Sequence, residues 1–84
     1  MKTFEIHAVL EDLIIGTLSR EGDLVRIEST NATYVSYMTK ALHGIKNLLE
    51  VNWEQGVELS EREFHSFSQR LVVWEIGVLK EKHI

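Results

Sequence analysis

The C-terminal residues 59–82 carry the strongest structural signal of this chain. Ser60 and Glu63 have the spacing of a capping box, in which each side chain binds a backbone N–H group at the start of a helix. Apolar residues then recur every three or four positions, which places them on one helical face. This row consists of Phe64, Phe67, Leu71, Trp74 and Val78. The pattern predicts one long helix over residues 60–82, with Trp74 in the core.

A second apolar row lies beside the first on this predicted helix and consists of Val72, Ile76 and Leu79. The two rows together are wider than the stripe of roughly 100° that one contact surface buries. Glu75 lies between the rows, so a covered Glu75 needs a basic partner such as Arg26, whereas an open seam leaves it solvated. The surplus apolar surface predicts a two-fold dimer with Ile76 or Leu79 near the contact.

Residues 1–29 alternate between apolar and polar side chains, which is typical of half-buried β-strands. Three strands are predicted, over residues 3–10, 13–19 and 24–29. A short helix over residues 8–18 is the alternative interpretation, because the leucines of this stretch also have helical spacing. The β-branched residues and Gly16 favour the strands.

The turn between the second and third predicted strands contains Gly22, which can adopt the positive φ of a tight hairpin. A two-residue loop of Glu21 and Gly22 would pair Leu18 with Val25. A three-residue loop would instead pair Thr17 with Val25, which reverses the faces of the strand. We prefer the first register because it places four polar residues together on the solvent side, namely Thr17, Ser19, Arg26 and Glu28.

Thr30 or Asn31 can cap a helix that the apolar spacing predicts over residues 32–53. Gly56 follows this helix and suits a left-handed helix end. The connection to the next helix is short, so the two helices are expected to be antiparallel neighbours. The prediction is therefore a single α+β domain over residues 1–84, with a three-stranded antiparallel sheet followed by two antiparallel helices packed on one face.

The small size of the chain limits how it can be stabilised. At 84 residues it is near the lower limit for a domain that folds alone, and without cysteine it has no disulfide. Oligomerisation is the stabilising device that remains. The net charge of −4 disfavours nonspecific binding to nucleic-acid phosphates. We expect a cytoplasmic protein, because a signal-peptide pattern is absent and no apolar run reaches the roughly 20 residues of a membrane span.

The sequence lacks the spacings that catalysis or metal binding usually requires. The four histidines form no H-x-H, H-x-x-H or H-E-x-x-H pair. There is no cysteine nucleophile, no G-x-S-x-G motif and no glycine-rich phosphate loop. We therefore expect no catalytic residue, no metal ligand and no cofactor. An enzyme with the carboxylate of Glu75 at its centre is the least favoured function.

We expect a small acidic protein-binding module that acts as an adaptor or inhibitor of another protein and forms a homodimer. An acidic surface would complement the charge of a partner with a basic functional site. The candidate interface residues are Val72, Glu75, Ile76, Leu79, Trp53, Tyr34 and Tyr37. The alternative is a nucleic-acid-associated regulatory protein that uses a local basic patch of Lys40, His43 and Lys46.

The predicted start of the C-terminal helix can be tested by replacing its capping residue. Ser60→Ala should lower the free energy of unfolding by about 1 kcal/mol, because the first turn loses a hydrogen-bond acceptor. Chemical denaturation measures this change. Unaltered stability would mean that no helix begins at this position.

Overall fold

The computed structural model describes residues 1–82 and contains the predicted antiparallel meander. Its strands are β1 (Lys2–Ala8), β2 (Ile14–Glu21) and β3 (Leu24–Glu28). The alternating pattern forms strands because every second side chain can be buried on one face, as Ile6, Leu18 and Val25 are. The alternative helix over residues 8–18 is not formed.

Two further strands extend the sheet to five, so the predicted number of three is wrong. β4 (Val57–Glu58) pairs with β3, and β5 (Gly77–Glu81) pairs with β1, both in antiparallel orientation. The spatial order is β4-β3-β2-β1-β5. Both additions cover edges of the meander, where unpaired backbone N–H and C=O groups would otherwise remain. Such long-range pairing has no signature in the local sequence.

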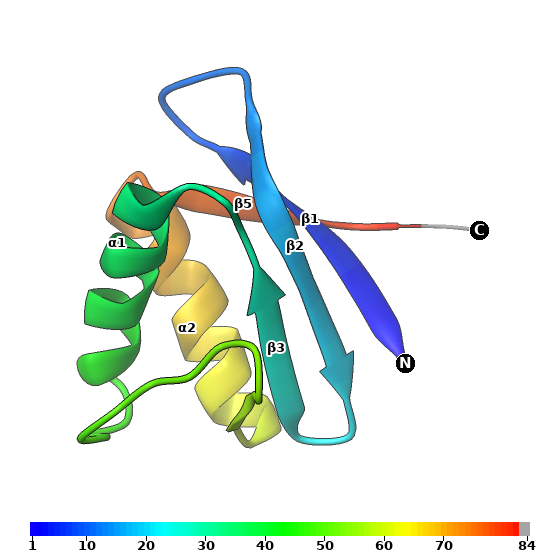
Figure 1. Cartoon of the computed structure of the whole chain (residues 1–84), viewed down its shortest axis with the longest axis vertical. Helices are drawn as coiled ribbons and strands as arrows, with labels where there is room; N and C mark the ends of the chain where they lie inside the picture. The colour runs from blue at the N-terminus through cyan, green and yellow to red at the C-terminus, as the bar shows by residue number, and fades with distance from the viewer. Residues whose placement is uncertain (83–84) are drawn as a thin grey trace.

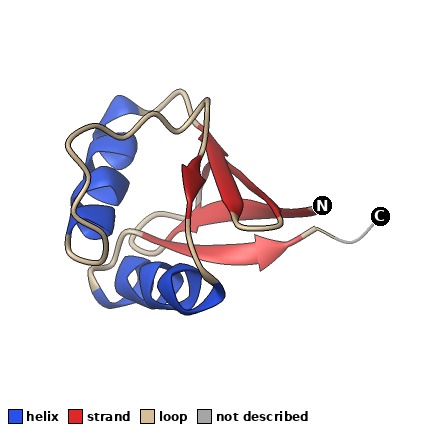
Figure 2. Cartoon of the chain, turned by 90° about the horizontal axis from the view of Figure 1, so that it is seen from below, coloured by secondary structure: helices blue, strands red, loops and turns tan. Residues whose placement is uncertain are grey.

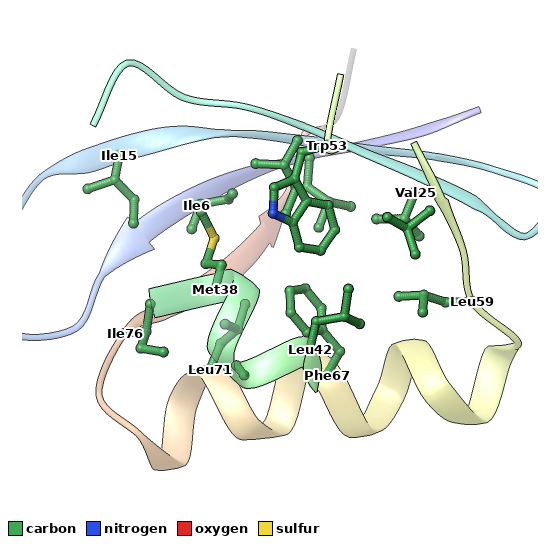
Figure 3. Packing of buried hydrophobic residues seen from close by; sticks show 14 of the residues in the cluster. Ile6, Ile15, Val25, Met38, Leu42, Trp53, Leu59, Phe67, Leu71 and Ile76 are labelled. Carbon is green, nitrogen blue, oxygen red and sulfur yellow. The ribbon is translucent and has the colours of Figure 1, made fainter. Parts of the chain in front are cut away.

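The helices α1 (Ala32–His43) and α2 (Glu61–Val73) lie on the same side of this sheet (Figure 1). The α+β class is therefore confirmed, with two helices and an antiparallel sheet. Seen from below, the helices and the strands occupy opposite sides of the molecule (Figure 2). One apolar core fills the space between the two layers (Figure 3). Its largest fully buried side chains include Phe67, Ile6, Leu18, Met38, Leu42, Leu59 and Leu71.

The β2–β3 hairpin differs in register from both predicted alternatives. Leu18 pairs with Ile27 and Arg20 with Val25, which leaves Gly22 and Asp23 as the loop. Gly22 has a φ of 59°, and a glycine at the first loop position suits a tight hairpin turn. The observed pairing differs from the preferred one by two residues, and an even shift keeps every side chain on its face. The four polar residues of the preferred register therefore still share the outer face.

The first helix ends at His43, so the predicted extension to residue 53 is wrong. The backbone N–H groups of Ile45 and Lys46 both donate to the carbonyl of Leu42, and these hydrogen bonds close the helix. Residues 44–56 then form an irregular connection to β4. In this loop Ile45, Leu48 and Val51 are partly buried against the core and Trp53 is buried, whereas Leu49 is fully exposed, so the apolar spacing does not reflect a helical face.

Both helices begin at the caps that the sequence indicates. The side chain of Asn31 accepts a hydrogen bond from the backbone N–H of Tyr34 at 3.2 Å. The capping box is confirmed, because Glu63 N–H donates to Ser60 Oγ at 3.1 Å and Ser60 N–H donates to Glu63 Oε1 at 2.8 Å. This backbone hydrogen bond is the main reason why the pKa of Glu63 is lowered, with a further contribution from the positive charge of Lys46.

The second helix ends at Val73, so the predicted helix over residues 60–82 is too long. Ile76 N–H donates to the carbonyl of Leu71 at 2.8 Å, and Glu75 N–H donates to that of Val72 at 3.0 Å. These two bonds are the pattern of a Schellman motif, in which the residue after the cap is left-handed. Glu75 accordingly has a φ of 58° and is exposed. It does not lie between two apolar rows of a helix.

The predicted second row of that helix is divided among α2, which keeps Val72, the turn that contains Ile76, and the strand β5, which contains Leu79. Leu79 pairs with Ile6 of β1, and Gly77 pairs with Ala8. A Cβ atom at Gly77 would lie 3.0 Å from Ile6 Cγ2 and 3.2 Å from the carbonyl oxygen of His7, so a larger residue would require a shift of a few tenths of an ångström between this strand and β1. Short apolar runs fit both the helical and the strand period, and pairing with β1 decides the outcome here.

Glu75 allows a test of the left-handed helix end. Glu75→Gly should raise the free energy of unfolding by roughly 0.5–1 kcal/mol, because this backbone conformation is unfavourable for any residue with a Cβ atom. Glu75→Ala keeps the strain and should change stability by less than about 0.5 kcal/mol. Chemical denaturation of both variants distinguishes the effects. A loss of about 3 kcal/mol in Glu75→Ala would instead indicate a buried charge pair.

Candidate functional site

The residues predicted as an interface separate into surface and core positions. Tyr34, Tyr37, Glu75 and Ile76 line one hollow, although Ile76 is only 4% exposed and forms part of its floor. Val72 is 47% exposed near the end of α2. Trp53 is only 6% exposed and belongs to the core, and Leu79 packs against that core. The surface part of the predicted interface is therefore concentrated at the α2–β5 turn and α1.

The aromatic hollow, as we call this site, has a volume of about 250 Å³. It forms where the β1–β2 loop and the α2–β5 turn approach α1 (Figure 1). Its lining residues are Leu10, Tyr34, Tyr37, Lys40, Trp74, Glu75 and Ile76. This volume lies below the roughly 300–1,000 Å³ of sites that enclose a drug-sized ligand, so the hollow suits a single side chain.

Three aromatic rings form the walls of the aromatic hollow. Tyr34 and Tyr37 meet edge to face, with their ring centroids 6.0 Å apart. The guanidinium of Arg70 lies over the ring of Trp74, 5.2 Å from its centroid. Trp74 is 48% exposed, so its predicted place in the core is wrong. The helix ends one residue earlier, and Ile76 enters the core instead.

The basic residues of the alternative function have different surroundings. Lys40 lines the aromatic hollow, and His43 is exposed at the end of α1. The ammonium group of Lys46 donates a hydrogen bond to the carbonyl of Glu58 at 2.6 Å. Its charge also acts on Glu63, as the lowered pKa of that carboxyl indicates. This engagement of Lys46 weakens the case for a free basic patch.

A second concavity, which we call the acidic groove, has a volume of about 1010 Å³ and is open to solvent. It lies between the start of β2, the end of β3 and the irregular connection after α1. Its apolar lining consists of Ile14, Ile15, Ile27, Val35, Val51 and Trp53. Its polar lining consists of Thr17, Glu28, Ser29, Thr30, Glu50, Asn52 and Glu54. Every charged residue of the groove is thus a glutamate.

Trp53 holds the wall of the acidic groove in place. Its carbonyl accepts a hydrogen bond from Ile27 N–H at 3.1 Å, and its indole Nε1 donates to Thr39 Oγ1 at 3.0 Å. Its ring packs against Phe67, with centroids 5.6 Å apart, and points into the core (Figure 3). The side-chain oxygen of Asn52 accepts hydrogen bonds from the backbone N–H groups of Glu54 and Gln55, both at 3.1 Å. The sequence does not indicate this groove, because the apolar spacing of residues 44–53 predicts a helix where the structure has a loop.

In residues 1–82, no three or more His, Asp or Glu side chains are grouped so that they could hold a metal ion. Neither helix of the described chain has the length and apolarity that a bilayer crossing requires. Comparisons with models of known families, with curated proteins and with solved structures return no match.

The role of Trp53 can be tested against the other tryptophan. Trp53→Phe should lower the free energy of unfolding by about 1–3 kcal/mol, because it removes the hydrogen bond to Thr39 and leaves a gap in the core. Trp74→Phe is the matched control and should change stability by less than about 0.5 kcal/mol, since Trp74 is half exposed. Chemical denaturation measures both. Equal losses would contradict the assigned roles.

Proposed function

We propose that this protein is a protein-binding module, and that it takes a basic segment of its partner into the acidic groove. The main support for this proposal is the negative charge of the groove lining, whose charged residues are Glu28, Glu50 and Glu54. A lysine- or arginine-containing segment would gain attraction from all three glutamates and repulsion from no lining cation. The overall charge of −4 favours the same class of partner.

The groove also offers apolar contact to such a segment. Val35 and Val51 are partly buried and lie between the core and the solvent. A segment that alternates basic and apolar residues could direct its apolar side chains to this floor and its charges to the glutamates. The volume of about 1010 Å³ is at the upper end of the range for small-ligand sites, so there is space for several residues.

The rigidity of the groove wall supports tight binding. Trp53 connects the wall to β3, α1 and α2 before any partner arrives. A preformed wall lowers the conformational entropy that binding would otherwise cost. The module would act as an inhibitor where the bound segment belongs to a basic functional site, and as an adaptor where it belongs to a tail.

The proposal can be tested with a short peptide in which lysine and valine alternate. We expect the labelled peptide to bind in fluorescence anisotropy, and a peptide with glutamate in place of lysine not to bind. The combined variant Glu28→Gln, Glu50→Gln and Glu54→Gln should weaken binding at least about fivefold, as expected for the loss of three partly exposed charge contacts. Binding should also weaken with added salt.

A matched control removes the same number of charges elsewhere. The combined variant Glu11→Gln, Glu21→Gln and Glu81→Gln changes three exposed glutamates outside the groove. It should alter peptide affinity by less than about twofold if the groove is the site. Equal weakening by both triple variants would mean that a diffuse negative field, and not the groove, attracts the peptide.

A further inference from the structure

Large apolar side chains that remain exposed gather around the aromatic hollow. Two of its lining residues are Leu10 of the β1–β2 connection, which is 73% exposed, and Trp74 after α2, which is 48% exposed. Tyr37 of α1 is 45% exposed and faces the same hollow. Single exposed apolar residues are normal, but several around one concavity mark a contact surface.

Two opposite charges border this apolar centre. Lys40 and Glu75 both line the hollow, and neither forms a salt bridge with any residue between 1 and 82. The lining of the hollow therefore contains one cation and one anion, and the guanidinium of Arg70 lies over its Trp74 ring. A two-fold axis brings the same patch of both copies together, so residue i of one copy meets residue j of the other. Such a patch complements a second copy of itself.

We infer that the aromatic hollow is one half of a two-fold symmetric contact between two copies of this chain. Lys40 of each copy faces Glu75 of the other copy, and Leu10 and Trp74 pack in the centre. The contact goes beyond the proposed function, because the hollow and the acidic groove share no lining residue. It also replaces the earlier basis for a dimer, since Ile76 is core and Leu79 belongs to β5.

The backbone of Glu75 adds an independent argument. Its φ of 58° is a conformation in which glycine is favoured and a side chain costs stability. A strained residue whose side chain borders a concave site is a reason to look for a role of that side chain. Pairing with a lysine across the two-fold axis gives the carboxylate such a role.

Sedimentation of the full chain over a concentration series tests the inference. We expect a dimer at tens of micromolar. Leu10→Asp should raise the dimer dissociation constant at least about tenfold, because it places a charge in the apolar centre. Leu10 is so exposed that this variant should retain its fold, which circular dichroism checks. A monomer at every concentration, or a dimer that Leu10→Asp leaves intact, would overturn the inference.

Charge reversal tests the two-fold pairing itself. Lys40→Glu alone and Glu75→Lys alone each create two like-charge contacts, so each variant should dimerise at least about tenfold more weakly. An equimolar mixture of the two variants should form heterodimers, because each glutamate then meets a lysine. Lys2→Glu and Glu21→Lys are control variants at exposed positions outside the hollow and should leave the dimer unchanged. Failure of the mixture to restore association would overturn the proposed pairing.

The two experiments separate the two proposals. Variants of the hollow should bind the basic peptide with unchanged affinity per chain, because the groove glutamates are intact. Variants of the groove should keep the dimer. Loss of peptide binding in Leu10→Asp would contradict the independence of the surfaces and therefore the assignment of the hollow to self-association.

Discussion

Trp53 connects the sheet to both helices through two hydrogen bonds and one ring contact. Its backbone carbonyl binds β3, its indole nitrogen binds α1, and its ring packs against α2. The packing of Ile45, Leu48 and Val51 against the core and the pairing of β4 with β3 also hold the irregular connection after α1 beside the sheet. The acidic groove exists because that connection is held there, and β4 follows from the same segment. Trp53 thus contributes both to the core packing and to the candidate binding surface.

The sequence predicts those features that depend on neighbours in the chain. Ser60 and Glu63 indicate the start of α2, because both capping partners lie within one turn. The alternation of apolar and polar residues around Ile6 and Val25 indicates strands, because this pattern also involves only neighbours in the sequence. The strand that follows α2 depends on a distant segment, because Leu79 is in a strand where Ile6 of β1 pairs with it. Local periodicity cannot distinguish that strand from a helix of the same composition.

The difference between local patterns and long-range contacts also explains which site residues the sequence predicts. Tyr34, Tyr37 and Glu75 were named because their amphipathic or isolated character stands out in the sequence, and they do line one hollow. Trp74 was assigned to the core because helical spacing places it beside Leu71, but the helix ends before it. The sequence does not indicate the groove glutamates, because Glu28 comes from the end of β3 and Glu50 and Glu54 come from the distant connection after α1. Only the tertiary arrangement creates that concentration of charge.

The position of β5 also affects the order in which the chain can acquire its structure. β1 comes from the first residues and pairs with β5, whose residues follow all the other elements. During synthesis on a ribosome, the open edge of β1 therefore waits until nearly the whole described chain has emerged. Closing so long a loop is slow, and an exposed strand edge can meanwhile pair with other chains. A nascent chain, or a chain shortened before β5, therefore exposes the edge of β1 and is prone to strand pairing with other chains.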